Sequence, residues 1–305
     1  MHFAPIALFA FNRPMHLHRV LKALAANELA NESHLTIFCD GPRHADEKAQ
    51  TESVRDIAAA AAGFASLTVR CRKDNAGVEK NMIDGITTLL SSNDNIIVLE
   101  DDLLTSPWFL RYMNEALGLY ADDSRIASIH AYAFPYDIHS SSDTFFLRQP
   151  GCWGWGTWKR AWKAFNPDAR QLLQALADKK LLRAFDVDGA YPYVNMLKHG
   201  TWDVCWYASN FLLERLTLHP ARSMIQNIGM DGSGTHCGKT TAMDISLTDH
   251  PLSVMPMPIM ENIVMKESHR RYLNELQGAQ GGISNAIRKK IGLFLDRSFP
   301  GLGKE

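Results

Sequence analysis

The sequence predicts an α/β protein with a mixed, mainly parallel sheet flanked by helices. Three observations support this fold class. In the first hundred residues, short apolar runs alternate with stretches whose apolar residues have helical spacing. Polar clusters directly follow three of the four apolar runs. The composition, with 46% hydrophobic and 21% charged residues, is that of an ordinary globular protein.

The first hundred residues contain four expected strands and three expected helices. The strands are short apolar runs, namely Ile6–Phe11, Thr36–Cys39, Leu67–Cys71 and Ile96–Leu99. The helices have helical apolar spacing or an alanine-rich composition, namely Met15–Leu29, Ala45–Ala62 and Val78–Leu90. This alternation is typical of parallel sheets, in which ligands bind outside the carboxyl ends of the strands.

The second half of the chain has a less regular pattern. Helices are predicted over Pro107–Tyr120, Asp168–Phe185 and Trp202–Arg215, and strands over Arg125–His130 and Ser223–Ile228. An aromatic, glycine-containing stretch covers residues 152–158, and a glycine-rich loop covers residues 229–236. Such a loop needs unusual dihedral angles or a close backbone approach.

Charge and hydropathy argue against two classes of protein, namely those that bind nucleic acid through global charge and those with a transmembrane helix. The chain has 32 lysine and arginine residues and 33 aspartate and glutamate residues, so its formal charge is −1. We therefore expect no nucleic acid partner bound through global charge. There is no run of about 18 apolar residues, so a transmembrane helix is not expected. Residues 1–13 predict a buried strand rather than a signal peptide.

Five cysteines are present, namely Cys39, Cys71, Cys152, Cys205 and Cys237. Their number is odd and no two are three positions apart, so a disulfide framework and a zinc ribbon are both unsupported. We expect mostly buried, inert thiols in a cytoplasmic protein.

The acidic triplet Glu100-Asp101-Asp102 is the sharpest local signal in the sequence. It directly follows the apolar run Ile96–Leu99, at the expected carboxyl end of a strand. Adjacent carboxylates repel one another unless a cation or hydrogen-bond donors compensate. Mg²⁺ or Mn²⁺ would compensate, with water and phosphate oxygens as further ligands. The alternative is a solvated acidic turn that caps the next helix.

Three further features each allow a functional and a structural interpretation. His236, in the glycine-rich loop, could contact a metal or a phosphate, or be purely structural. Asp203 could be a general base with a raised pKa, or simply the N-cap or a first-turn acid of a helix. Trp153 and Trp155 could form a platform on which a sugar stacks, or belong to the core.

Seven short stretches carry a family resemblance, in order over residues 4–240. They are Ala10–Pro14, Phe38–Pro42, Asp74–Gly77, Val98–Asp102, Trp153–Trp158, Trp202-Asp203 and Asn227–His236. The ordered set resembles GT-A-fold nucleotide-sugar glycosyltransferases, whose fold is Rossmann-like. It is similar to bacterial glycosyltransferases labelled hemolysin-like, and more distantly to the Golgi N-acetylglucosaminyltransferase that begins complex N-glycan branching.

The resemblance implies a set of nucleotide- and donor-binding residues. Arg13 and Asp40 would contact the base, and Asn75 would lie in the loop that helps to hold the nucleotide. Glu100 and Asp101 would contact the donor sugar and the ribose.

The resemblance also implies a metal site and a catalytic base. Asp102 would ligate Mn²⁺ or Mg²⁺, and the glycine-rich loop with His236 would close over the diphosphate. Whether His236 also contacts the metal stays open. Asp203 would deprotonate an acceptor hydroxyl, which gives displacement with inversion.

The expected reaction is metal-dependent, inverting transfer from a UDP-sugar, UDP-GlcNAc or similar, to a glycan or lipid-linked glycan acceptor. The expected setting is synthesis of a bacterial surface polysaccharide. We expect one catalytic domain over residues 1–265, with a nucleotide-binding half (1–105) and an acceptor and catalytic half (106–265). A helical tail is expected over residues 266–305.

Two alternatives and one membrane contact complete the expectations. A sugar nucleotidyltransferase would usually need a glycine-rich loop with Arg or Lys after the first strand, which this sequence lacks. A non-catalytic glycan-binding surface protein would bind sugar without nucleotide or metal. Residues 281–299 have the pattern of a basic amphipathic helix, which could lie on the inner membrane face or dock on the domain.

Overall fold

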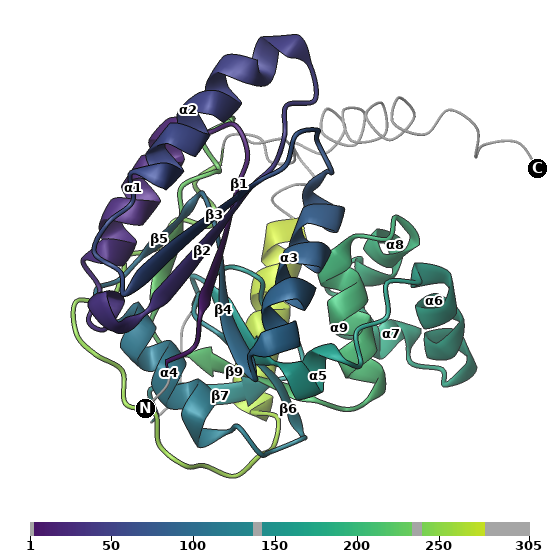
Figure 1. The fold of residues 1–305 in the computed structure, drawn as a ribbon. Coiled ribbons are helices and arrows are strands. Elements are labelled where there is room, and N and C mark those ends of the chain that lie inside the picture. Colours follow the sequence, from purple (N-terminus) through teal and green to yellow (C-terminus); the bar gives the residue numbers. More distant parts are fainter. Residues whose placement is uncertain (1–2, 137–141, 234–239, 278–305) are drawn as a thin grey trace, which may run out of the picture.

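The computed structural model describes residues 3–136, 142–233 and 240–277. Within them, a mixed sheet has the strand order β3-β2-β1-β4-β8-β6-β9-β7, and a two-stranded sheet pairs β10 with β5 (Figure 1). The strands of the large sheet are β1 (Ile6–Ala10), β2 (His34–Cys39), β3 (Ser66–Cys71), β4 (Asn95–Glu100), β6 (Ile126–His130), β7 (Thr144–Leu147), β8 (Trp155–Trp158) and β9 (Leu216–Pro220). Those of the small sheet are β5 (Leu103–Thr105) and β10 (Ile225–Asn227). The predicted α/β fold class is confirmed.

The first four strands of the order form a parallel block. β1 pairs with both β2 and β4, and β2 pairs with β3, all in parallel. Every residue of β1 is buried. Because successive side chains of a strand point to opposite faces, Leu8 and Phe9 belong to separate apolar clusters. Both faces of the sheet are therefore covered at β1, as its continuous apolar run predicts, whereas the residues of the outermost strand β3 are exposed or half-buried.

Helices cover both faces of the sheet. They are α1 (Pro14–Ala25), α2 (Lys48–Ala59), α3 (Val78–Ser92), α4 (Phe109–Leu119), α5 (Lys159–Trp162), α6 (Ala169–Asp178), α7 (Leu182–Phe185), α8 (Tyr193–Lys198) and α9 (Trp202–Leu212). Two 3₁₀ turns lie at η1 (Ala30–Glu32) and η2 (Ala45–Glu47). Residues of α1, α2 and α4 pack on one face of the sheet, and residues of α3, α5 and α9 pack on the other.

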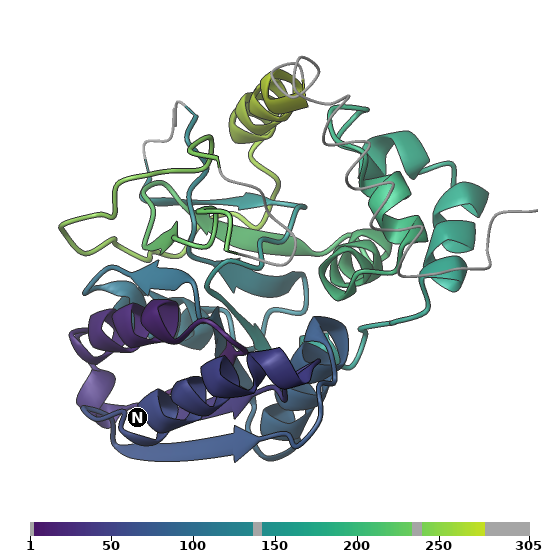
Figure 2. The same cartoon turned by 90° about the horizontal axis from the view of Figure 1, so that it is seen from above.

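The second half of the chain adds antiparallel pairs and a small helical cluster. β8 is antiparallel to both β4 and β6. Helices α6 to α9 share an apolar cluster of their own, and Figure 2 shows them grouped away from α1 and α2. Nine of the eleven residues of α9 are buried, because α9 contributes to this cluster and also to the cluster on the sheet.

The prediction of one helix over Asp168–Phe185 is wrong. The segment forms α6 and α7, separated by a turn in which Lys180 has φ +57°. The N–H of Leu181 donates to the carbonyl of Leu176, and that of Lys180 donates to Ala177. These two bonds form a Schellman motif, which ends a helix at a left-handed residue.

The expected boundary after residue 265 falls inside a helix that spans residues 263–277. Met265 packs with Phe145 and Leu147, and Leu273 packs with Val187. The first part of the expected tail is therefore packed on the domain. Residues 281–299, for which a membrane contact is predicted, lie outside the described residues. No helix in the described part of the chain is long and apolar enough to span a membrane.

The cysteines differ in exposure. Cys39 and Cys205 are buried, Cys152 is half-buried and Cys71 is exposed, whereas Cys237 lies outside the described residues. The expectation of burial thus does not hold for Cys71, which ends the outermost strand β3.

Three buried histidines cluster on β6, β9 and helix 263–277. His130, His219 and His269 are each at most 2% exposed. The Nδ1 atoms of His130 and His219 are 3.3 Å apart. Neither ring nitrogen of His269 has a partner among the described residues. Burial lowers the pKa of His219 to about 4 and that of His269 to about 3, and lowers the pKa of His130 well below its ordinary value.

We expect these histidines to make stability fall as the pH drops below about 6.5. The unfolded chain protonates each histidine near pH 6.5, whereas the folded chain keeps it neutral to lower pH. The stabilisation is present above pH 6.5, and His219 and His269 each lose about 2 kcal/mol of it by pH 5. Urea unfolding of the wild type and of His269→Phe from pH 7 to 5 measures the difference.

The exposed His199 provides the matched control for this experiment. His199→Gln should keep the wild-type pH dependence, whereas His269→Phe should weaken it. Identical slopes for the wild type and His269→Phe would show that His269 is not buried as a neutral ring.

Candidate functional site

The carboxyl ends of β1, β2 and β4 lie side by side at one edge of the sheet (Figure 1). Phe9 of β1 is paired with Phe38 of β2 on one side and with Glu100 of β4 on the other. The polar clusters that follow these strands therefore meet. The structure brings together the predicted residues of the first half of the chain.

Arg13 is bound between two carboxylates of the acidic triplet. Its Nη2 donates to Asp101 and, at 2.9 Å, to Oδ2 of Asp102. Pro14 is the first residue of α1, so Arg13 occupies the cap position directly before the helix. Burial opposes the charge of Arg13, but the two carboxylates outweigh it and raise the pKa of the guanidinium.

The triplet carries more negative charge than Arg13 balances. Burial, followed by the charges of Asp102 and Asp101, raises the pKa of Glu100 well above its ordinary value. Burial also raises the pKa of Asp101, although Arg13 and the N–H of Phe11 lower it. Three carboxyl groups therefore share one guanidinium, and a cation would relieve their repulsion.

The residues at this edge fit a divalent cation that shares its ligands with a phosphate. The side chain of Asp102 is 15% exposed, against 4% for Asp101, so Asp102 is the more accessible carboxylate. Among the described residues, no group of three His, Cys, Asp or Glu side chains is arranged to hold a metal. Mg²⁺ is usually held by only one or two carboxylates, with water and phosphate oxygens completing its shell.

The first residue of the glycine-rich loop, Gly229, lies directly against Asp102. The N–H of Ile228 donates to the carbonyl oxygen of Asp102 at 2.8 Å. A Cβ on Gly229 would lie 2.1 Å from Oδ2 of Asp102 and 2.8 Å from Nη1 of Arg13. Only glycine lets the backbone come this close, which explains part of the glycine content of the loop.

His16 is a site residue that the sequence reasoning missed. Its Nε2 lies 3.3 Å from the carbonyl oxygen of Ile228 and 3.2 Å from Oδ2 of Asp231. It therefore joins the first turn of α1 to the glycine-rich loop. No local pattern in the sequence distinguishes His16 from the other polar residues of α1. His236, which the sequence placed in this loop, lies outside the described residues, so its role stays a prediction.

Asp40 and Asn75 lie together, and Asp40 holds the loop that contains Asn75. The Asp40 carboxylate accepts from the N–H of Ala76 at 2.9 Å, the N–H of Gly77 at 3.0 Å and Nδ2 of Asn75 at 3.1 Å. A Cβ on Gly41 would lie 2.4 Å from the backbone carbon of Asp74. The two loops are thus packed backbone to backbone.

Asp203 lies in the first turn of α9, within electrostatic reach of the triplet. The charge of Asp203 contributes to the raised pKa of Glu100. Cys152 has a pKa raised by burial and then by Asp203 and Glu100 together. Asp203 is not the N-cap of α9, which is Thr201. Oδ1 of Asp203 accepts the N–H of Val204 at 2.9 Å, so Asp203 is the first-turn acid that the structural alternative expects, and its catalytic role stays a prediction.

The expectation that Trp155 forms a sugar platform is corrected. Trp155 is 0% exposed, so neither face of its ring can contact a ligand. Its ring lies 5.8 Å from those of Trp202 and Trp206, within the apolar cluster under α3 and α9. Trp153 is half-buried, with its ring edge-on to Tyr132 at 4.9 Å. The core alternative holds for Trp155, and the role of Trp153 stays a prediction.

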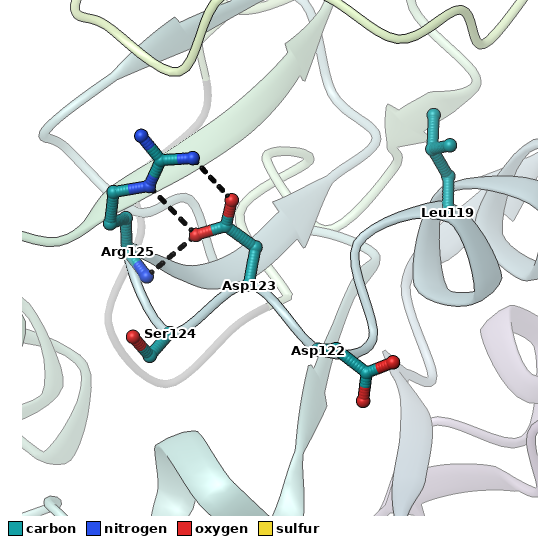
Figure 3. Close-up of a pocket in the computed structure, with 5 residues that line it drawn as sticks. All are labelled: Leu119, Asp122, Asp123, Ser124 and Arg125. Carbon is teal, nitrogen blue, oxygen red and sulfur yellow. Dashed lines mark hydrogen bonds and ion pairs between the residues drawn. The ribbon is translucent and has the colours of Figure 1, made fainter.

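A surface hollow lies at the opposite edge of the sheet. Figure 3 shows its lining, Leu119 and residues 122–125, in the turn between α4 and β6. Asp123 forms an ion pair with Arg125 at 2.6 Å across it. Because this turn precedes β6, it is remote from the carboxyl ends of the parallel strands.

Comparisons with known proteins give low similarities. No protein-family model matches the chain, and no curated protein matches it. Among solved structures, a mannosyltransferase from Pyrobaculum calidifontis, in complex with GDP-Man and Mn²⁺, is 11% identical with a TM-score of 0.39. Residues 1–349 of TarS from S. aureus are 10% identical with a TM-score of 0.42. A protein described as a nucleotide-diphospho-sugar transferase, from Desulfovibrio desulfuricans G20, is 13% identical with a TM-score of 0.34.

The matched regions are partial. The similarity covers 58%, 74% and 55% of this chain, respectively, and 47%, 61% and 68% of the three others. This chain thus spans about half the length of the mannosyltransferase. Identities and TM-scores this low carry no conclusion about the reaction.

We expect Gly41→Ala to destabilise the fold by about 1–3 kcal/mol, the usual cost of overpacking. The added Cβ would push against the backbone of Asp74 and strain the loop that Asp40 holds. Urea unfolding measures the change.

Gly118→Ala is the matched control, because a Cβ on this exposed residue of α4 meets nothing within 4 Å. That control should be neutral or stabilising, since alanine favours helix. Equal stability of both variants would contradict the close approach.

Proposed function

We propose that the chain is a GT-A-fold nucleotide-sugar glycosyltransferase. The observation that carries this proposal is the meeting of Arg13 and the triplet at the carboxyl edge of the sheet, with Asp203 in electrostatic reach. An excess of carboxylates around a single guanidinium suits the binding of a metal–diphosphate. A separate carboxylate nearby suits the deprotonation of an acceptor. The ordered motifs of the sequence agree with this assignment.

In the proposed reaction, the loop held by Asp40 and the residues around Arg13 bind the nucleotide part of a UDP-sugar, with Asn75 in the loop. Glu100 and Asp101 contact the ribose and the donor sugar. Asp102 would hold Mn²⁺ or Mg²⁺, which supplies positive charge to the leaving nucleoside diphosphate. The backbone at Gly229 lies against Oδ2 of Asp102, beside the accessible part of that carboxylate.

Asp203 supplies the base. Its carboxylate takes the proton of the acceptor hydroxyl while the acceptor oxygen bonds to the anomeric carbon of the sugar. The bond from that carbon to the diphosphate oxygen breaks on the opposite side, so the configuration inverts. The acceptor is a glycan or a lipid-linked glycan of a bacterial surface polysaccharide, modified in the cytoplasm. Contact of residues 281–299 with the inner membrane face would bring a lipid-linked acceptor near.

The burial of Trp155 weakens the alternative of a non-catalytic glycan-binding protein. That alternative depends on an exposed tryptophan surface, and Trp155 has none. It also gives no role to the triplet and Arg13.

We expect UDP to stabilise the protein only together with Mn²⁺. A ligand that binds the native state at about a hundredfold its dissociation constant adds about 2.7 kcal/mol of stability. This raises the melting temperature by about 4 °C for a chain of 305 residues. Thermal-shift assays with UDP, GDP, CDP, TDP and ADP, each with and without Mn²⁺, measure this effect. Asp102→Asn should abolish the metal-dependent shift, whereas Asp122→Asn, in the hollow at the opposite edge, should keep it.

A panel in which no nucleotide shifts the melting temperature, with or without metal, would argue strongly against the proposed function. A shift for GDP rather than UDP would keep the transferase and change its donor.

We expect Asp203→Asn to keep donor binding and to lose transfer by about 10²–10⁴-fold, the usual contribution of a general base. UDP release from UDP-GlcNAc and related donors, measured with a panel of glycan acceptors, gives the rate. The UDP and Mn²⁺ thermal shift of the same variant serves as its folding and binding control. Equal transfer by the wild type and Asp203→Asn would exclude Asp203 as the base.

A further inference from the structure

Glu79 of α3 contacts the first residue of α9, 123 positions along the chain. Its Oε2 accepts the N–H of Trp202 at 2.6 Å. The first N–H groups of a helix have no partner within the helix and need one elsewhere. The N-cap residue Thr201 makes no capping bond, and its buried Oγ1 has no partner among the described residues. Glu79 therefore takes the place of a local cap.

Packing of the Trp202 ring also fixes the start of α9. Trp202 is 6% exposed, and its ring stacks on that of Trp155 at 5.8 Å. Met82 and Ile86, which follow Glu79 on α3, belong to the same apolar cluster as Trp202. The start of α9 is thus held through the ring of Trp202, which stacks on Trp155, and through the N–H of Trp202, which donates to Glu79. Asp203 is the next residue, so its position depends on both contacts.

Glu79 also connects α9 to the loop that Asp40 holds. Gly77 is the N-cap of α3, with φ +79°, and its N–H donates to Asp40 at 3.0 Å. Glu79 follows two residues later. One short segment therefore contacts the proposed nucleotide side through Gly77 and, through Glu79, the residue directly before the proposed base.

The charge of Glu79 lies beside that of Asp203. Burial raises the pKa of Glu79 to about 7, the N–H of Trp202 lowers it, and Asp203 raises it. The other titratable group of α9 that interacts with Glu79 is Cys205, whose pKa is raised to about 12 by burial and then by Glu79 and Asp203. Near neutral pH, Glu79 thus changes between a neutral and a charged acceptor for the Trp202 N–H.

We propose that Glu79 is a positioning residue for Asp203: its carboxylate caps α9 from outside and fixes the base relative to Glu100 and the nucleotide loop. This inference rests on the proposed transferase function. The role requires no contact between Glu79 and the substrate.

Two substitutions separate the hydrogen bond from the charge. Glu79→Ala leaves the Trp202 N–H without its partner, so we expect kcat to fall tenfold or more, because small misplacements of catalytic groups are costly. The UDP and Mn²⁺ thermal shift should stay as in the wild type. Glu79→Gln keeps a neutral acceptor oxygen, so its kcat should match that of the wild type below pH 7 and stay above that of Glu79→Ala.

The pH profile gives a readout that a merely structural role would not move. In the wild type, kcat should rise about fivefold through pH 7, since a charged acceptor makes the stronger hydrogen bond. Glu79→Gln should lack this rise, because its amide does not titrate. A rise of the same size in Glu79→Gln would overturn the proposal, as would a wild-type kcat in Glu79→Ala.

Asp168 offers a matched control, because its carboxylate caps the neighbouring helix α6 through the N–H groups of Arg170 and Gln171. Asp168→Ala should lower the melting temperature by an amount similar to that for Glu79→Ala, with kcat and the pH profile unchanged. An equal loss of kcat in both variants would show that general destabilisation explains the effect of Glu79.

A spectroscopic readout separates failure of this inference from failure of the proposed function. The ¹H–¹⁵N signal of Trp202 should titrate near pH 7 in the wild type and not in Glu79→Gln. If it does so while the wild type transfers no sugar, the proposed function is overturned, and the catalytic role of Glu79 with it. If transfer is normal and the signal does not titrate, the inference alone is overturned.

Discussion

The bond of Arg13 to Asp101 and Asp102 is the constraint on which the candidate site depends. A guanidinium placed between two carboxylates at the end of β4 sets the direction in which α1 leaves the sheet. Breaking one partner of such a buried pair leaves an uncompensated charge, which costs several kcal/mol. The backbone near Gly229 lies against the same atoms. The start of α1, the triplet and the glycine-rich loop are therefore one electrostatic unit.

Buried tryptophans connect the first half of the chain to the second half through one apolar cluster. Trp155 of β8 and Trp202 of α9 stack inside the cluster that also contains residues of α3. Helix α9 is apolar on nearly all sides because it lies between that cluster and helices α6 to α8. A helix enclosed in this way has few ways to move. A carboxylate in its first turn is correspondingly well fixed in space.

The sequence predicts the parallel block of the sheet well and the rest less well. β1, β2 and β4 are mainly apolar runs followed by polar residues, so their parallel pairing brings those polar residues to one edge of the sheet. β8 is four residues long and contains glycine, so no periodicity marks it. Trp155 could be core or platform, because one residue type serves both. The contact of Glu79 with Trp202 joins distant segments, and no local pattern encodes it.

The position of β8 in the sequence determines when the two blocks of the sheet can join. In the described residues, the block β3-β2-β1-β4 and the block β6-β9-β7 are joined only through β8, which lies between β4 and β6. β8 follows both of these neighbours in sequence. A nascent chain that has not yet reached residue 158 therefore leaves β4 and β6 as open edges, which are templates for wrong pairing. Once in place, β8 covers the edge of β4 and one edge of β6, whereas the other edge of β6 stays open until β9 is synthesised. The chain is therefore exposed to wrong strand pairing over two successive intervals of its synthesis.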